Sequence, residues 1–530
     1  MAEEFDLVVI GGGHNGLACA AYLQKAGMST CVLERRHNIG GGCATEEVTL
    51  PGFKHNLHSV MHIGGPMYRT LELDKYGAKY VRPDPNYAFV TRDGRAILSY
   101  LDVDATCETI AQFSKKDAKT YKSLNEKFQH LRQVVNAYWH SEPLPLSKLY
   151  ALLEGAPDGK LMIQILNSSV KQVTDAFFEN EAVKCWLAIA AMQGSVPYDL
   201  AGTGLQIPTM VSAMHGHSNG ICIGGSRMLA EALVNVITAA GGAVRKNSHV
   251  AKVIVEHGTA TGVELENGSQ IMARCAIASN TNVKALMLEL VGEACLDDEF
   301  ARRVRAFQAD EVSFFTPHFA LNEPPLYAAA RKNPDVQKAL GVAWGVEHSA
   351  EILSHHYQLR QGLVPRECVA FSIAPTVHDP SQAPPGKHTA FTWQVAPFRL
   401  KEGPEHWLKI KEDYGEHIRK VWCDYAPNMQ GENILAHFNY SPYDISQTTI
   451  SMFEGSIAHG HISPNQMGDL RPVPGWANYR MPVKHLYLCG GSAHPMGGVT
   501  GAPGFNCAGA IADDYKMKKW WWRPSKTLKG

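Results

Sequence analysis

The sequence predicts an α/β protein built on a parallel sheet, and two stretches near opposite ends of the 530-residue chain predict this class. Residues 6–10 (Asp-Leu-Val-Val-Ile) are an apolar run that passes into glycines and then into a helical pattern, and residues 485–490 begin a second such unit. A short apolar run that ends in glycine is typical of a parallel strand buried on both faces. Because a helix follows each run, we expect parallel strands joined by helices.

The first unit has the residues that a dinucleotide phosphate group requires. Gly11 permits a tight turn, Gly13 lets a pyrophosphate approach the backbone, and Gly16 allows close helix–strand packing. A helix from about Asn15 directs its free N–H groups and its positive dipole end at the phosphates. A second apolar run ends at Glu34, whose carboxylate can accept hydrogen bonds from ribose hydroxyls and would repel a 2′-phosphate. The unit therefore matches the Rossmann-like dinucleotide fingerprint in its strand–turn–helix–strand context.

The residues after this unit resemble one group of flavoproteins. Arg35 follows the acid, and the glycine pair Gly40-Gly41 comes shortly after it. This order is similar to the FAD-binding extension of glutathione-reductase-type flavoproteins, in the amine oxidase and phytoene desaturase group. The resemblance implies an FAD cofactor, with backbone amides of the glycine pair near the pyrophosphate. Many members place Arg directly after the pair, whereas Gly42 and Cys43 stand here.

Three histidines follow in a loop or hairpin, at positions 55, 58 and 62. They predict a polar loop packed near the cofactor, and a flavin-facing proton donor, a covalent histidyl link and a metal site are the alternatives. Beyond them, residues 80–100 alternate in polarity around Asp93-Gly94 and predict a hairpin. Residues 104–214 have helical spacing and predict a helical insertion, interrupted at 155–159.

The middle of the chain predicts a second part of the cofactor domain and then a substrate domain. A helix over 228–237 and strands over 249–256, 262–265 and 270–279 resemble the returning half of the FAD domain, with Val250 at the adenine. Strand candidates between residues 300 and 480 predict an antiparallel sheet with a helix near 405–426, and residues 455–472 resemble a late motif of the desaturases. Two His-Gly-His triplets, 215–217 and 459–461, would each place their histidines on one side of a strand, but we predict no metal site.

The C-terminal unit places a second helix N-terminus against a ligand. The strand over 485–490 leads into a loop with glycines at 490, 491, 497, 498 and 501, and then into a helix through 506–513. By resemblance this helix end faces the flavin, and its N–H groups stabilise negative charge on it. Relatives outside the desaturases carry Asp in the loop; here Gly491 or Ser492 stands near that place, and His494-Pro495 resembles the carotenoid desaturase and isomerase version. The predicted cofactor-binding residues are Gly11, Gly13, His14, Asn15, Gly16, Glu34, Arg35, Gly40, Gly41, Val250, Gly490, Gly491, Gly498 and Val499.

Composition sets limits on the class of protein. The chain is 45% hydrophobic and 19% charged with a formal net charge of −1, which gives no indication of nucleic acid binding. Its twelve cysteines include no CxxC pair and favour a reducing compartment. The N-terminus leaves no room for a signal peptide and no apolar run is long enough to span a membrane, so we expect a cytoplasmic protein. The Trp520–Trp522 run beside basic residues predicts a membrane-surface contact, a subunit contact, or a tail folded on the protein itself.

Together these features predict an α/β flavoprotein with three parts. Residues 1–70, 215–295 and 480–530 form a Rossmann-like FAD-binding domain, residues 71–103 and 296–479 a mixed antiparallel-sheet substrate domain, and residues 104–214 a helical cap. The resemblance implies dehydrogenation of a hydrophobic or alicyclic molecule by hydride transfer to flavin N5, with oxygen, a quinone or a protein as electron acceptor. His62 and His494 are the predicted catalytic residues. Amine oxidation, a flavin-dependent isomerase or saturase, and a non-catalytic flavoprotein component remain alternatives.

Overall fold

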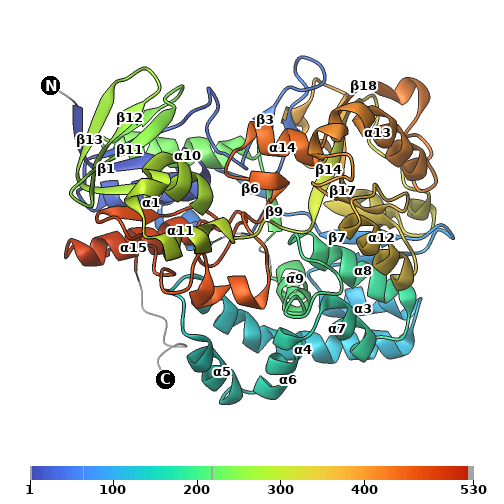
Figure 1. Ribbon diagram of the computed structural model, residues 1–530. Helices are drawn as coiled ribbons and strands as arrows, with labels where there is room; N and C mark the ends of the chain where they lie inside the picture. Colours follow the sequence, from blue (N-terminus) through green and yellow to red (C-terminus); the bar gives the residue numbers. More distant parts are fainter. Residues whose placement is uncertain (1–2, 64, 217–218, 523–530) are drawn as a thin grey trace.

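The computed structural model describes residues 3–63, 65–216 and 219–522. Two sheets of seven strands lie at opposite sides of the molecule, and a group of helices lies below them in the view of Figure 1. This arrangement confirms the predicted fold class: a Rossmann-like unit, a mixed sheet and a helical insertion.

The first sheet contains the strands that the glycine-ended runs predict. Its parallel part is formed by β10 (Ala243–Arg245), β2 (Thr30–Leu33), β1 (Glu3–Ile10), β13 (Gln270–Ser279) and β19 (Leu486–Leu488), and β12 (Thr259–Leu265) and β11 (Val250–Glu256) extend it in antiparallel fashion. Leu7, Val8 and Val9 have no exposed surface, as expected of a strand covered on both faces. Ile10 is in register with Leu33 and with Ser279, so the carboxyl ends of β1, β2 and β13 meet at one edge.

Helices α1 (His14–Lys25) and α15 (Ala502–Asp514) pack against one another beside this sheet, and α10 (Arg227–Ala239) packs on α1. The predicted close approach at Gly16 is present, because a Cβ there would lie 2.5 Å from the Gly11 carbonyl oxygen. The two long-separated strand–glycine–helix units are therefore neighbours, and both helices begin near the same edge of the sheet (Figure 1).

The second sheet has the order β18 (Ile434–Tyr440), β14 (Ser313–Leu321), β17 (His388–Ala396), β16 (Val369–Ile373), β15 (Gly341–Gly345), β7 (Tyr87–Val90) and β8 (Ala96–Ser99). All neighbours are antiparallel except β15 and β7. One face packs on α13 (Trp407–Cys423) through Phe315, which stacks on Trp407. Phe314 and Trp393 lie on the other face, 6.0 Å apart, and this face borders the site described below.

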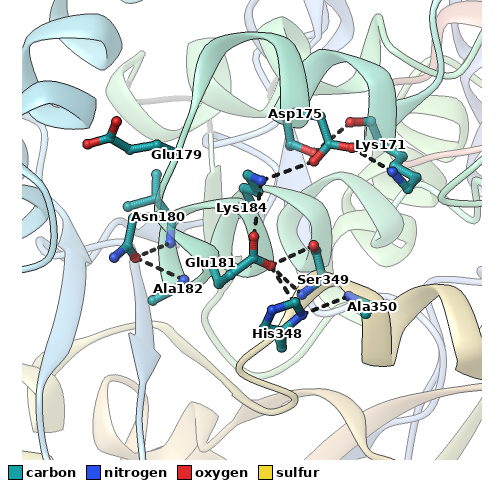
Figure 2. A network of polar contacts seen from close by, with 12 residues as sticks. Lys171, Asp175, Glu179, Asn180, Glu181, Ala182, Lys184, His348, Ser349 and Ala350 are labelled. Atoms are coloured by element: carbon teal, nitrogen blue, oxygen red, sulfur yellow. Dashed lines mark hydrogen bonds and ion pairs between the residues drawn. The ribbon is translucent and has the colours of Figure 1, made fainter.

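The helical insertion consists of α3 (Val103–Ala111), α4 (Lys115–Trp139), α5 (Leu146–Glu154), α6 (Gly159–Asn167), α7 (Val170–Phe177), α8 (Glu181–Met192) and α9 (Gln206–His215). Figure 2 shows how it is attached to α12 (Ser349–Arg360), which packs against α8. The Glu181 carboxylate accepts hydrogen bonds from the backbone N–H and the hydroxyl of Ser349, at 2.8 and 2.6 Å, and from Lys184 at 3.0 Å. Lys184 also pairs with Asp175 of α7.

The remaining elements are short: β3 (Thr45–Glu46), β4 (His55–Asn56), β5 (Met61–Ile63), α2 (Pro66–Thr70), β6 (Tyr80–Val81), β9 (Asn219–Cys222), a π-helix (Ala285–Gly292), α11 (Asp298–Arg305) and α14 (Pro442–Thr448).

The described residues of the two His-Gly-His triplets do not form strands, so the one-sided arrangement that a strand would give their histidines does not arise. His215 is the last residue of α9, and residues 459–461 lie in irregular structure held by loop hydrogen bonds. His217 lies outside the described residues. His215 contacts the Tyr121 hydroxyl and the Tyr100 carbonyl oxygen, whereas His459 contacts the Ser451 carbonyl oxygen, so the two triplets serve separate packing roles.

Two of the three tail tryptophans pack on the protein itself. Trp521 is 3% exposed and stacks on Tyr22 of α1, and Trp522 stacks on Phe505 of α15, each with ring centroids 5.1 Å apart. Trp520 retains 36% exposure. Among the residues that the structure describes, no helix combines the length and the apolar character needed to cross a bilayer.

Candidate cofactor and substrate site

A cleft at the carboxyl edge of the first sheet brings together residues predicted to bind the cofactor. It has a volume of about 140 Å³, and its wall includes the ends of β1, β2 and β13 and residues 448–451. Crevices at this position of a parallel sheet are where dinucleotides bind. The predicted residues on its wall are Gly11, Gly13, Glu34, Arg35, Gly41 and Val250.

The Glu34 carboxylate is held in place at the end of β2. Its Oε2 accepts a hydrogen bond from the Gly12 N–H and its Oε1 from the Arg36 N–H, both at 2.8 Å. Each oxygen has a further lone pair, which can accept from a ribose hydroxyl. Arg35, in contrast, donates to the Thr448 carbonyl oxygen at 3.0 Å. Arg35 therefore fastens the opposite wall of the cleft.

Gly13 lies on the wall of the cleft, with other residues close on two sides. A Cβ at this position would lie 2.3 Å from Nδ2 of Asn280, and a Cβ on Gly41 would lie 3.2 Å from the Gly13 Cα. Gly13 is also the N-cap of α1 and has no side-chain cap, so the first N–H groups of this helix are available to an anion. The backbone here forms a cradle that a single Cβ would fill, and this fits a pyrophosphate between the two glycine segments.

Sequence reasoning missed the third contributor to this cleft. Asn280 and Thr281 directly follow β13, as Gly11 follows β1 and Glu34 follows β2. Their position directly after a predicted strand was the signal that could have identified them, because polar residues at the carboxyl end of a parallel strand face the ligand crevice. Pairing of β13 with β1 brings Asn280 beside Gly13 across about 270 residues of intervening sequence, and that pairing is a tertiary property.

A second cavity lies between the two sheets and has a volume of about 180 Å³. We call it the inner cavity. The predicted residues His14, Gly498 and Val499 border it, next to the residues that precede α15. The rest of its wall comes from the second sheet, from α9 and from the loops at 58–61 and 452–459: Gly42, His58, Ser59, Met61, Tyr87, Trp139, Gln193, Gly194, Gln206, Thr209, Met210, Phe314, Trp393, Met452, Ile457, Ala458, His459, Met496, Gly497 and Thr500.

A third cavity, the outer cavity, lies beside α4, α5 and α6 and has a volume of about 160 Å³. Its wall is mainly aliphatic and aromatic, with Leu149, Leu153 and Met162 among its members. Four residues border both the inner and the outer cavity: Trp139, Gln206, Thr209 and Met496. The two cavities are therefore adjacent, and apolar surface predominates in both. Concave apolar sites with few polar groups are typical of small-molecule binding.

The two predicted catalytic histidines lie outside the inner cavity wall. His62 is 3% exposed and its Nδ1 lies 2.6 Å from the Tyr80 hydroxyl, while His494 borders the outer cavity with Nε2 3.1 Å from the Tyr138 carbonyl oxygen. Burial lowers the pKa of His62 to about 3 and that of His494 to about 4. Both rings are therefore neutral at physiological pH. Their catalytic role stays a prediction, and His14, His58 and His459 are the histidines that border the inner cavity.

Five predicted cofactor contacts border neither the cleft nor the inner cavity: Asn15, Gly16, Gly40, Gly490 and Gly491. The glycines permit close packing behind the site. A Cβ on Gly40 would lie 2.7 Å from the Cys43 carbonyl oxygen, and one on Gly490 would lie 2.8 Å from the Thr281 carbonyl oxygen. Asn15 Oδ1 is buried without a partner among the described residues. Direct contact of these five residues with a cofactor stays a prediction.

A buried arginine holds the inner cavity wall in place. Arg471 is 0% exposed and donates to the carbonyl oxygens of Ala458, His459 and Gly491 at 3.0, 3.2 and 2.9 Å, with longer contacts to Gly460 and His461. Burial lowers its pKa to about 10, so the guanidinium is charged at neutral pH. One side chain thus joins the 458–461 loop to the glycine loop after β19.

Asp310 fixes the start of the same loop. Its Oδ2 accepts hydrogen bonds from the Ser456 hydroxyl at 2.7 Å and from the Ala458 N–H at 3.0 Å. Burial raises the pKa of Asp310 to about 7, although these hydrogen bonds and the charge of Arg471 oppose the shift. Neither Asp310 nor Arg471 was predicted as a site residue, because each acts on a loop that packing brings beside it.

We expect the protein to lose stability as the pH falls from 6.5 towards 4. Burial lowers the pKa of His14 and His459 to about 4 and that of His58 to about 3, so the folded state keeps these rings neutral while the unfolded state binds protons. Asp310 acts in the opposite direction, since it keeps its proton when folded and releases it when unfolded. Burial likewise lowers the pKa of His62 and His355 to about 3 and that of His494 to about 4. The protons taken up by the unfolded state therefore outnumber the one held by Asp310, and we expect a loss of more than about 2 kcal/mol between pH 6 and pH 5.

Urea unfolding midpoints at pH 7.5, 6 and 5 measure this dependence. The variant Asp310→Asn removes the opposing group and keeps both accepted hydrogen bonds, so its stability is expected to fall more steeply with acid than that of the wild type. Stability that is constant or rises from pH 6 to pH 5 would contradict the assignment of neutral buried histidines.

The fold and the cleft define a class: a Rossmann-like protein with a dinucleotide-type cleft at the carboxyl edge of its first sheet, next to a second sheet. Residues 9–71 match the family model of the NAD(P)-binding Rossmann-like domain. The chain is 32% identical to mouse pyridine nucleotide-disulfide oxidoreductase domain-containing protein 2 over 97% of this chain and 94% of that protein. The chain belongs to the family of this protein, within the phytoene desaturase-like flavoprotein oxidoreductases.

Two further relatives align over nearly the whole chain. A limonene dehydrogenase subunit of Castellaniella defragrans is 28% identical over 99% of this chain and 98% of its own length. A lycopene-forming phytoene desaturase of a Paracoccus species is 23% identical over 94% of this chain and 95% of its own length. The resemblance inferred from the glycine motifs is thereby confirmed, and a flavin-type cofactor is the one that this family implies.

Proposed function

We propose that the protein is an FAD-dependent dehydrogenase that introduces a C=C double bond into a neutral, hydrophobic or alicyclic small molecule. The observation that carries this proposal is the inner cavity, in which the glycine loop before α15 meets a wall of Phe314, Trp393 and several methionines. The described residues on this wall comprise apolar, hydroxyl, amide and imidazole side chains, which suit an uncharged substrate. The names of two relatives, a limonene dehydrogenase subunit and a phytoene desaturase, support the same reaction class.

The residues of the chain would hold FAD as follows. Glu34 accepts from the ribose, Gly13 and the N-terminus of α1 bind the pyrophosphate, and the N-terminus of α15 lies at the flavin end of the site. Gly501, the N-cap of α15, has no side-chain cap, so backbone N–H groups there can face negative charge. A bound flavin supplies the hydride acceptor. The protein orients the substrate C–H bond and excludes water through the apolar wall.

A proton must also leave the substrate, and His58 is the candidate acceptor. Its ring borders the inner cavity, its Nε2 lies 3.3 Å from the Thr449 hydroxyl, and its Nδ1 is buried without a partner among the described residues. Burial lowers the pKa of the ring to about 3, so the ring is neutral and one of its nitrogens has a free lone pair that can accept the proton, although as a weak base. His62 and His494 are retained as alternative flavin-proximal residues.

Anaerobic bleaching of the flavin tests the proposed reaction. We expect the purified full-length protein to release FAD on denaturation and its visible absorbance to bleach with alicyclic or terpenoid hydrocarbons and steroids, but not with primary amines. Bleaching by amines alone would instead support an amine oxidase. Isomerised or saturated product without net use of an acceptor would support the isomerase or saturase alternative. Bleaching by no compound would favour a non-catalytic flavoprotein component.

Histidine variants assign the proton acceptor once a bleaching substrate is known. We expect His58→Gln to slow flavin reduction by roughly 100-fold, within the range for loss of general base catalysis. His62→Gln and His494→Gln serve as matched replacements of buried neutral histidines. A normal rate of flavin reduction in His58→Gln, together with slow reduction in His62→Gln or His494→Gln, would assign the proton acceptor to one of these two sequence-predicted histidines instead.

A further inference from the structure

The side-chain amide of Gln193, a residue of the inner cavity wall, is buried and has no hydrogen-bond partner in the described part of the protein. It follows the last residue of α8, and its backbone N–H closes that helix by bonding to the Ala190 carbonyl oxygen at 3.3 Å. Both polar atoms of its side chain, Oε1 and Nε2, are shielded from solvent and have no hydrogen-bond partner among the described residues. Gln193 as a residue borders the inner cavity, and its carboxamide would have to turn to present these two atoms to a ligand there.

Two other buried glutamines show how the amide of a structural glutamine is hydrogen-bonded in this protein. Gln382 is 0% exposed, accepts from the Asn56 amide at 2.8 Å and donates to the Asp379 carboxylate at 2.8 Å. Gln466 likewise has partners for both ends of its amide. A buried amide without partners costs free energy of folding, so its retention at a cavity wall calls for an explanation other than packing.

The neighbours of Gln193 form a small polar area within an apolar wall. Gln206, at the start of α9, also borders the inner cavity, and a Cβ on Gly194 would lie only 3.0 Å from Gln206 Oε1. The glycine therefore lets α9 bring the second amide close to the α8–α9 connection. Thr209, one turn along α9, donates its hydroxyl to the Leu205 carbonyl oxygen at 2.8 Å, and its oxygen lone pairs can still accept.

We propose that Gln193, together with Gln206, is a specificity-determining contact for a hydroxyl group on an otherwise apolar ligand. This proposal rests on the proposed function and narrows its substrate class to alicyclic or terpenoid alcohols. A hydroxyl can donate to Oε1 and accept from Nε2, so one small group satisfies both unpaired atoms of the amide. The terminal torsion of a glutamine is soft, which allows the carboxamide to turn towards a ligand oxygen.

Two probes of the same ten-carbon skeleton test the proposal: limonene and its hydrated form, α-terpineol. Binding is measured on flavin-loaded protein whose flavin has been reduced beforehand under anaerobic conditions, so that neither probe can be oxidised, by calorimetric titration and by the shift of the thermal unfolding midpoint. We expect the wild type to bind α-terpineol about tenfold more tightly than limonene. In Gln193→Met, which retains side-chain length without the amide, this preference is expected to disappear while limonene affinity stays within about twofold.

The unfolding midpoint without ligand provides an independent readout. Gln193→Met removes an amide that lacks partners and is expected to unfold at the same or a higher temperature than the wild type. Gln382→Met is the matched control and is expected to unfold at a lower temperature, because Asn56 and Asp379 lose their partner. The milder variant Gln193→Asn retains the amide on a shorter side chain and keeps the test available if Gln193→Met does not fold.

A wild type that binds the two probes equally, or binds neither, would overturn the proposal, as would a preference for the alcohol that persists in Gln193→Met. These measurements use equilibrium binding and require no turnover. Failure of the dehydrogenase assignment would appear as absent bleaching with an intact alcohol preference, whereas failure of the Gln193 assignment would appear as bleaching without that preference.

Discussion

Gly13→Ala is expected to abolish tight binding of the flavin cofactor. The new Cβ would lie 2.3 Å from Nδ2 of Asn280, inside van der Waals contact, and would occupy the cradle at the N-terminus of α1. The Asn280 side chain can turn away from the methyl group, but the methyl group itself remains where the pyrophosphate must approach the backbone, so we expect cofactor affinity to fall roughly 100-fold. Gly13 has φ −71°, which alanine adopts without strain, so the effect arises from the space it fills. Flavin content after dialysis, read from fluorescence of the released cofactor, measures the loss.

The double variant Gly13→Ala/Asn280→Ala separates packing from cofactor binding. Removal of the Asn280 side chain relieves the clash, so unfolding in the absence of cofactor is expected to return towards that of Asn280→Ala alone. The methyl group still lies where the pyrophosphate must approach the backbone, and flavin binding is expected to stay weak. Recovery of full flavin content in the double variant would show that Gly13 serves only the protein's own packing.

Arg471→Met is expected to destabilise the protein by about 3–5 kcal/mol and to lower its flavin content. Methionine leaves the carbonyl oxygens of Ala458, His459 and Gly491 without their donor, in an interior that water does not reach. The inner cavity wall and the glycine loop after β19 then lose their common anchor. The midpoint of urea unfolding and the flavin-to-protein ratio are the two measurements.

Arg274→Met is the matched control on the surface of the first sheet. Arg274 pairs with Glu4 and Asp6, but 45% of its side chain is exposed. Water replaces the lost contacts there, so the unfolding midpoint and flavin content are expected to change little. Equal losses in the two variants would mean that the interior position of Arg471 has no special importance for stability.

Much of the fold could be predicted because its signals are local. The strand, glycine turn, helix and acid of residues 6–34 lie within one short segment, and each residue type has a direct steric or electrostatic reason. The same holds for α15 and the strand before it, and for the helical periodicity of the insertion. For the His-Gly-His triplets, residue spacing alone did not determine whether the segment is extended, and their described residues lie in a helix end and in irregular structure.

The structure also shows why the histidines could not be ranked from their pattern. His58 and His62 are four residues apart and both are buried, yet only His58 borders the inner cavity, while His62 turns to the Tyr80 hydroxyl. The direction in which a loop side chain points depends on what packs around it. A short polar segment does not encode that direction by itself.

The sequence alone therefore determined the dinucleotide-binding edge, with Gly13 and Glu34, because short-range backbone geometry creates that site. Only the tertiary structure decided which distant residues complete it. Asn280 reaches Gly13 through the pairing of β13 with β1, Arg471 collects carbonyl groups from two loops, and Gln193 lies on a cavity wall without a partner among the described residues. Each of these positions depends on contacts between segments far apart in the chain, and packing of the whole molecule is what brings such segments together.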